Sequence, residues 1–314
     1  MKRLIFFAII LTGFCFSQTI EVVKNEQILP DKKQFMANPK FSPDGNKILL
    51  SSAKYKGLWL YDLKDKRLEN LNTKNGAGYK AHFSADGSKV LFRYNSYKNR
   101  RKHSTLAIQN IDNNEIQSLV QEKRKLSPPH FTNEASILFN LKGKKQVFDL
   151  AENQVREISA LSKPVSSEPV AYTENSELFV IKNGEEEVLN PLGEGHYIWG
   201  SISPEKERIL FTLAGKGTYI SDLDGNIIAE LGYLNAPRWS PDGKWVVGMQ
   251  DRDNGERITE SDIVVVTANG QKTFKLTDTK DKIEMYPAWS PTENKLAFNT
   301  LDGKIEILQI QINN

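Results

Sequence analysis

Short runs of apolar and β-branched residues recur along the chain, and each follows the same motif, an aromatic or large apolar residue before a polar turn. The strong copies read Phe-Ser-Pro-Asp-Gly, Phe-Ser-Ala-Asp-Gly and Trp-Ser-Pro-Asp-Gly, beginning at Phe41, Phe83 and Trp239. Weaker copies begin at Phe131, Ile202 and Trp289. In a tight hairpin, Asp accepts hydrogen bonds within its own turn and Gly adopts a positive φ. The motif therefore predicts β-hairpins, and its aspartates are expected to be structural.

Two apolar runs with strand-forming composition follow each copy of the motif, and a Gly, Asp or Asn turn then leads into a third. The first runs span 47–51, 89–92, 136–139, 208–212, 245–249 and 295–299. The second runs span 57–63, 105–111, 145–150, 217–223, 262–267 and 304–309. Sustained helical periodicity does not extend beyond about ten residues anywhere in the mature chain. The pattern predicts an all-β protein of repeated four-stranded antiparallel sheets.

Four-stranded units that repeat about every 35 to 50 residues are typical of a β-propeller. The copies lie about 40 to 50 residues apart, except for one longer gap before Ile202 that has room for a degenerate unit at 163–191. Seven blades are therefore most consistent with the spacing, and six is the alternative if this segment is an insertion. The strand-like run at 20–29 lies outside the repeats, and we expect it to join the last blade and close the ring.

The repeat resembles the TolB-type, WD-like β-propeller repeat. The resemblance covers residues 38–312 and rests on the aromatic-Ser-Pro-Asp-Gly hairpin, the strand Ser-Asp-Ile-Val-Val-Val at 261–266 and the polar segment at 250–255. It implies the fold and leaves the function open. Members of this family include a periplasmic protein-binding component of an envelope complex, propeller domains that gate peptidases, and lyases of pectin fragments. The first has an additional α/β domain and the second a hydrolase domain, and we find neither pattern here.

The N-terminal segment has the composition of a secretory signal, a short basic start followed by an apolar run at 4–16. This run is shorter than the roughly 20 residues of a transmembrane helix. We therefore expect a signal peptide at 1–18 and a single propeller domain at 19–314, periplasmic or secreted and not membrane-spanning. The only cysteine, Cys15, lies in the leader, so disulfides are not expected to stabilise the mature fold.

Composition excludes two classes of function. The chain is 39% hydrophobic and 26% charged, which is enough apolar material for a sizeable core and excludes a disordered scaffold. Removal of the two basic residues of the leader reduces the formal net charge of +3 to about +1, which is too small for the basic footprint of a nucleic-acid-binding protein. Any electrostatic binding must therefore come from local clusters.

The residue before each motif aromatic is the first candidate for ligand binding. Side chains alternate along a strand, so if the aromatics fill the space between blades, the preceding residues face the other way. These residues are Lys40, His82, His130, Ser201, Arg238 and Ala288. The ligand-binding candidates among them are those that can carry positive charge near a central channel, Lys40, His82, His130 and Arg238. They suit an anionic group; the alternative is hydrogen bonding between blades or solvation at the channel wall.

The four histidines do not have the sequence spacing of a metal site. His82 and His130 occupy equivalent positions and could approach one another, whereas His103 lies in a basic hairpin and His196 in a connecting segment. We expect neither a metal nor another cofactor, and we find no recognisable catalytic constellation.

Two long charged hairpins are the candidates for partner binding, because loops on a rigid scaffold often carry binding residues and Tyr and Arg are frequent at interfaces. Their candidate residues are Tyr94, Tyr97, Arg100, Arg101, Asp251, Arg252 and Arg257. Further aromatics are expected on the same face, in the connections that lead into the inner strands: Tyr79, Tyr197, Trp199, Tyr233 and Tyr286. The alternative is that these residues form ordinary solvated loops.

The sequence favours a non-enzymatic scaffold that binds a protein or peptide of the cell envelope through one loop-rich face. The alternative is a binder or lyase of acidic oligosaccharides at the channel mouth. Nucleic acid is not expected as a partner, and the sequence does not identify the ligand.

Overall fold

The computed structural model describes residues 19–29, 34–133, 136–157, 168–280 and 282–313. The expected signal peptide at 1–18 lies outside the described residues. Within the described ranges the regular structure is β-strand apart from the short 3-10 helix η1 (Ala53–Tyr55). Among the described residues, no helix has the length and apolar character needed to cross a membrane.

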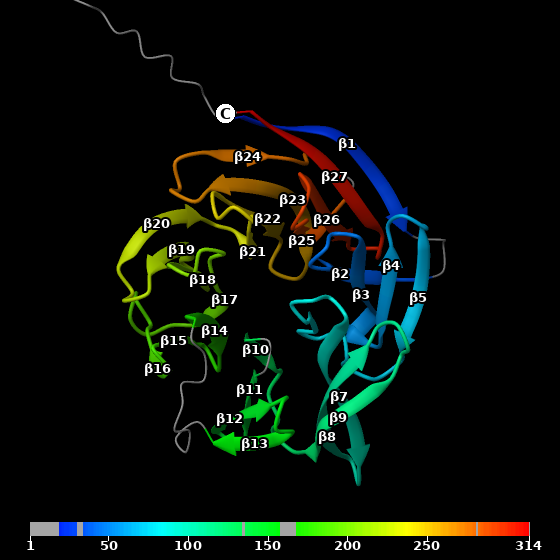
Figure 1. Ribbon diagram of the computed structural model, residues 1–314. Coiled ribbons are helices and arrows are strands. Elements are labelled where there is room, and N and C mark those ends of the chain that lie inside the picture. The colour runs from blue at the N-terminus through cyan, green and yellow to red at the C-terminus, as the bar shows by residue number, and fades with distance from the viewer. Residues whose placement is uncertain (1–18, 30–33, 134–135, 158–167, 281, 314) are drawn as a thin grey trace, which may run out of the picture.

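The strands form antiparallel sheets arranged in a ring (Figure 1). The first two sheets contain β2 (Met36–Phe41), β3 (Lys47–Ser52), β4 (Leu58–Asp62) and β5 (Arg67–Asn72), then β6 (His82–Phe83), β7 (Lys89–Lys98), β8 (Arg101–Asn110) and β9 (Ile116–Lys123). The next contains β10 (His130–Asn133), β11 (Ser136–Leu141), β12 (Lys144–Asp149) and β13 (Gln154–Glu157). Two sheets near the C-terminus contain β21 (Asn235–Trp239), β22 (Trp245–Asp253), β23 (Ile258–Thr267) and β24 (Thr273–Lys275), then β25 (Glu284–Trp289), β26 (Lys295–Thr300), β27 (Ile305–Asn313) and β1 (Thr19–Leu29).

The segment that lacks the sequence motif forms part of a seven-stranded sheet. This sheet contains β14 (Val170–Glu174), β15 (Glu177–Lys182) and β16 (Glu185–Val188), followed by β17 (Tyr197–Ile202), β18 (Arg208–Leu213), β19 (Gly217–Asp222) and β20 (Ile227–Gly232). Its two parts are paired through Tyr172 of β14 and Ser201 of β17. The described part of the degenerate unit expected at 163–191, residues 168–191, thus contains three strands, and 163–167 lie outside the described residues. Every apolar run predicted as a strand overlaps a strand of the structure.

The N-terminal strand β1 pairs antiparallel with β27, so the two ends of the described chain lie in one sheet (Figure 1). The pairing begins at Thr19 opposite Asn313 and ends at Leu29 opposite Ile305. Ile20 is buried in the core beside β27. The first residues of the fold therefore complete a sheet whose other strands come from the C-terminus.

Hydrophobic clusters lie between consecutive sheets, and also between the two parts of the seven-stranded sheet, and hold the ring together. Four of them join β3–β5 to β7 and β8, β7–β9 to β11 and β12, β11 and β12 to β14 and β15, and β14 and β15 to β17 and β18. The others join β18–β20 to β22 and β23, β22 and β23 to β26, β27 and β1, and β26 and β27 to β2–β4. The motif aromatics, predicted to fill these spaces, pack against the clusters, as expected for Phe41, Phe83, Phe131, Trp239 and Trp289.

The polar part of the motif forms the hairpin that joins the first two strands of a sheet. Ser42 Oγ donates to Asp44 Oδ1 at 2.5 Å and accepts from the backbone N–H of Lys47, and the N–H of Gly45 donates to the Ser42 carbonyl. The hydrogen bond from Ser42, together with those from the backbone and side chain of Asn46, holds the pKa of the Asp44 carboxyl below its usual value. The motif aspartates are therefore turn residues, and the functional candidates lie elsewhere.

Candidate functional site

A ring of equivalent side chains lies on the innermost strands, opposite the same position of the neighbouring second strand. The pairs are Lys40 with Leu49, His82 with Leu91, His130 with Leu138, Tyr172 with Phe179, Ser201 with Leu210, Arg238 with Val247 and Ala288 with Ala297. Tyr172 is the member from the degenerate unit. Sequence reasoning missed it because this unit has no motif aromatic to mark the position.

Just before these positions, four inner strands and the turn that precedes β6 contain residues whose backbone lies in the left-handed region. Asn38, Lys80, Trp199, Ala236 and Tyr286 have φ values of 56°, 53°, 55°, 47° and 54°. In the four strands the ladder also shifts register at this point. A bulge re-aims the side chain it contains, and left-handed backbone is uncommon for bulky residues such as Trp and Tyr. All five of these residues line one pocket.

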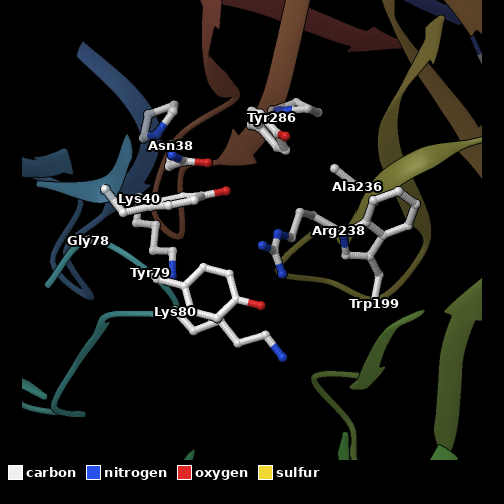
Figure 2. Close-up of a pocket in the computed structure, with 12 residues that line it drawn as sticks. Asn38, Lys40, Gly78, Tyr79, Lys80, Trp199, Ala236, Arg238 and Tyr286 are labelled. Atoms are coloured by element: carbon white, nitrogen blue, oxygen red, sulfur yellow. The ribbon is translucent and has the colours of Figure 1, made fainter. Parts of the chain in front are cut away.

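This central pocket has a volume of about 160 Å³ and is formed by residues from several sheets. Figure 2 shows Arg238 extending into it from one side and Lys40 on the other side, with the Lys40 amine directed toward Tyr79 and Lys80. Tyr55 packs edge-to-face on Tyr79, with ring centroids 5.2 Å apart. The twelve lining residues include three cations and four aromatic rings and no carboxylate. Since liquid water occupies about 30 Å³ per molecule, the pocket suits a small anionic group with part of the molecule that carries it.

The cations in the pocket lower one another's affinity for protons. Burial and the neighbouring Arg238 and Lys80 lower the pKa of Lys40 to about 7. Burial also lowers the pKa of Lys80 and of Arg238. Lys40 Nζ donates to the carbonyl of Ala81 at 2.5 Å, whereas the Arg238 guanidinium has no hydrogen-bond or ion-pair partner among the described residues. The pocket therefore carries positive charge that a bound anion would balance.

The two ring histidines contribute differently from what the sequence suggested. Burial and nearby cations lower the pKa of His130 to about 3 and that of His82 well below its usual value. Both imidazoles are therefore neutral at pH 7, and the positive ring expected from four residues is reduced to Lys40 and Arg238, with Lys80 as an addition. His82 Nε2 and Ser201 Oγ are buried without a hydrogen-bond partner in the structure. Both groups can donate a hydrogen bond to a molecule in the channel.

The histidines belong to an aromatic row. The ring centroids of His82 and His130 are 6.0 Å apart, and those of His130 and Tyr172 are 5.3 Å apart. The Tyr172 hydroxyl is hydrogen-bonded to Lys145 and Glu186, and the amine of Lys145 forms an ion pair of 3.0 Å with Glu174. This network fixes one wall of the channel next to the pocket.

The charged hairpins contain more strand and less loop than the sequence suggested. Tyr94 and Tyr97 lie on β7, Arg101 on β8, and Asp251 and Arg252 on β22. The ladder of β7 and β8 continues to the pair Lys98 and Arg101, which leaves a two-residue turn at Asn99 and Arg100. In the other hairpin Arg257 lies in the turn, and the side chain of Arg252 forms an ion pair with Glu260. Five of the seven candidate residues are thus held on paired strands, and Arg100 and Arg257 lie in the turns.

The aromatic residues expected in the connections also lie partly on strands. Tyr197 and Trp199 are on β17 and Tyr286 is on β25, while Tyr79 and Tyr233 are in connections. Tyr197 is in the core, and its hydroxyl donates to the carbonyl of Gly193. Trp199, Tyr286 and Tyr79 line the central pocket. We predicted that Tyr197, Trp199 and Tyr286 lie in connections, whereas they lie on strands. The bulges in these strands interrupt the alternation of side chains by which a strand is recognised in a sequence.

No protein-family model and no curated protein matches the chain. Solved structures do resemble it. An oligogalacturonate lyase in complex with manganese aligns with a TM-score of 0.65 at 13% identity, over 94% of this chain and 98% of that one. The β-propeller domain of Cps50 (Swd1) from Myceliophteria thermophila aligns with a TM-score of 0.64 at 12% identity, over 93% of this chain and 100% of that one. TolB from Acinetobacter baumannii aligns with a TM-score of 0.53 at 16% identity, over 84% of this chain and 59% of that one.

The chain is a β-propeller. At these identities the likeness shows the fold and does not carry over an activity. The resemblance of the repeats to the TolB type is therefore a resemblance of fold. The function of this propeller has to be argued from its own channel.

The donors of this propeller do not fit a metal such as the manganese of that lyase. His82 and His130 are close enough to share an ion by distance. However, the described residues contain no group of three or more His, Cys, Asp or Glu side chains that could hold one, and a stable site needs at least three protein ligands. Lys40 also lies near both imidazoles, where its charge repels a cation.

Proposed function

We propose that this propeller is a non-enzymatic binding protein that holds a protein or peptide partner on the face where the central pocket opens. The observation that carries the proposal is the convergence of Lys40, Lys80 and Arg238 in a pocket without a carboxylate. Lys40 and Lys80 are half-buried and Arg238 remains accessible to solvent, so the repulsion between these neighbouring charges is only partly screened, and an acidic group of the partner would supply the missing counter-charge. Tyr79, Trp199 and Tyr286 at the pocket wall would add the aromatic contact area common at interfaces.

The ring that presents this pocket is, we infer, a closed propeller of seven blades. The two parts of the seven-stranded sheet count as separate blades because a hydrophobic cluster lies between them, as between every other pair of neighbours. The cluster between β26 and β2–β4 and the pairing of β1 with β27 support closure. In keeping with the expected leader, we place the binding function in the periplasm or outside the cell.

A second candidate function, the binding or β-elimination of an acidic oligosaccharide, is favoured by one observation. A lysine with a pKa of about 7 beside Arg238 could remove the proton next to a uronate carboxylate while the guanidinium binds that carboxylate. The propeller neighbours include an oligogalacturonate lyase, although at an identity that shows the fold alone.

Binding of triglutamate to the purified protein, measured by calorimetry, tests the proposal. We expect the affinity to fall at least about tenfold in Arg238→Gln, since a hydrogen bond to a charged group contributes about 1.5 to 3 kcal/mol. The exposed Lys244→Gln, on the same sheet, is the matched control and should leave the affinity unchanged. If triglutamate does not bind to the wild-type protein, the pocket does not have the binding role that we propose.

Trigalacturonate separates the two candidates. If the purified protein generates an unsaturated product, seen by ultraviolet absorbance, and Lys40→Met abolishes it, the protein is a lyase and the first proposal fails. Recovery of the same partner proteins by the wild type and by Arg238→Gln would also contradict a role for the pocket in partner binding.

A further inference from the structure

Three neighbouring cavities connect the central pocket with a basic hairpin. The second cavity has a volume of about 750 Å³ and shares Tyr79, Lys80 and Trp199 with the central pocket. The third has a volume of about 480 Å³ and shares Arg93, Lys125 and Leu126 with the second. The shared residues place the three cavities side by side in a row, and we call this row the groove.

The third cavity is almost entirely cationic. It is lined by Arg93, Arg100, Arg101, Lys102, Ser104, Arg124, Lys125 and Leu126. Its charges lie close enough to affect one another. Burial and the charge of the nearby Arg93 lower the pKa of Lys102. The one carboxylate that lines the second cavity, Glu174, is already paired with Lys145 at 3.0 Å. The groove therefore has an excess of positive charge from one end to the other.

Arg93 occupies the point where the second and third cavities meet. Its Nη1 donates to the carbonyl of Leu126 at 2.6 Å, and its guanidinium lies 5.9 Å from the centre of the Tyr79 ring. Its Nε is buried without a hydrogen-bond partner in the structure. The side chain is thus positioned by its neighbours while one donor is left for a ligand.

The hairpin holds its arginines in a defined place. Asn99 and Arg100 have φ values of 48° and 59°, the conformation of a two-residue type I′ turn. The ladder on either side runs without a register shift to Lys98 and Arg101. Arg100 and Arg101 are therefore presented by a rigid ribbon, which lowers the entropy cost of binding.

We propose that this groove binds an acidic segment of a partner polypeptide in an extended conformation. One acidic side chain would enter the central pocket, and others would contact the arginines of the third cavity. The inference rests on the proposed function and names the chemistry of the partner. Arginine binds carboxylates in a bidentate manner, and Ser127, Asn140 and Asn175 of the second cavity offer neutral groups to a peptide backbone. Single-stranded nucleic acids depend on aromatic stacking, which the lining of the third cavity does not provide.

A fluorescein-labelled decaglutamate peptide, followed by fluorescence anisotropy, tests this proposal beside unlabelled triglutamate. We expect decaglutamate to bind more tightly than triglutamate. The double variant Arg100→Gln/Arg101→Gln should weaken decaglutamate binding about 2- to 30-fold, the range expected for the loss of two exposed ion pairs, and should leave triglutamate binding unchanged. Arg238→Gln should weaken the binding of both peptides.

The matched control is Lys66→Gln/Arg67→Gln, which removes the same charge from an exposed position at the start of β5 and should change neither affinity. If Arg238→Gln weakens both peptides but the Arg100/Arg101 variant weakens neither, the groove is overturned and the central pocket stands. If neither peptide binds the wild type, the proposed function itself fails. Tighter binding of decagalacturonate than of decaglutamate would overturn the assignment to a polypeptide.

Discussion

At the residue scale, the channel concentrates positive charge where solvation is reduced. Burial and two neighbouring cations lower the pKa of Lys40 to about 7, while the guanidinium of Arg238 stays charged because the pKa of arginine lies far above neutral pH. The imidazoles of His82 and His130 lose their protons well below neutral pH for the same reasons. Lys40 is therefore the group whose charge in the pocket changes near physiological pH.

Lys40 makes anion binding depend on pH. It is charged below pH 7 and neutral above, so the affinity for triglutamate should fall as pH rises through 7. The midpoint of this fall should lie higher than the pKa of the free protein, because a bound anion favours the protonated amine.

The same lysine makes stability depend on pH. A lysine in the unfolded chain keeps its proton to about pH 10.4, so the free energy of unfolding should rise with pH between about 7 and 10.4. Titrations and thermal melts from pH 6 to 10, roughly, test both trends. Lys40→Arg should bind without this pH dependence; a flat wild-type profile would contradict the assignment.

At the element scale, the same turn recurs at hairpins that the sequence motif did not mark. Thr267 Oγ1 donates to Asn269 Oδ1, and the N–H of Gly270 donates to the Thr267 carbonyl, as Ser42, Asp44 and Gly45 do in the first unit. The glycine adopts a positive φ and also lies close to the neighbouring sheet. This turn therefore contributes to packing between sheets as well as to the reversal of the chain.

Gly270→Ala separates these two contributions. Gly270 has φ +74°, and an added Cβ would lie 2.4 Å from the backbone oxygen of Glu230. We expect a loss of about 2 to 4 kcal/mol in the free energy of unfolding. Gly143→Ala is the control, with φ +89° and open space around the added Cβ, and should lose only about 1 kcal/mol. Urea denaturation measures both, and equal losses would show that the contact with Glu230 is unimportant.

At the scale of the whole molecule, strands from both ends of the chain share a sheet. β1 covers β27, and Ile20 fills the cluster between that sheet and β22 and β23. An uncovered strand edge is a template for pairing with another chain. The N-terminal strand is therefore expected to protect the propeller from self-association as well as to stabilise it.

Deletion of residues 19–29 tests this role. The truncated protein should unfold at a lower temperature and form oligomers or aggregates, because β27 loses its partner and Ile20 leaves the core. Size-exclusion chromatography with light scattering and a thermal melt measure both effects. Val23→Ser, at a side chain that is 54% exposed on β1, is the control and should remain as stable as the wild type. A monomeric truncated protein with an unchanged melting temperature would contradict the prediction.

The sequence by itself determined the all-β class, the hairpins and the positions of Lys40, His82, His130 and Arg238 on the inner strands. These features depend on local turn chemistry and on the alternation of side chains along a strand, which can be read from neighbouring residues. Tyr172 escaped detection because its unit has the strands and lacks the motif.

Only the tertiary structure decided which of these side chains meet and what charge they carry. Bulges bring Trp199 and Tyr286 into the pocket with Lys40 and Arg238, and the turn before β6 adds Lys80; sequence alternation does not predict a bulge. The histidines are neutral because they are buried and cations from other sheets lie beside them. The three cavities of the groove are neighbours because residues of different sheets line them together. Burial and charge–charge repulsion depend on such distances in space, and separation along the chain does not contain them.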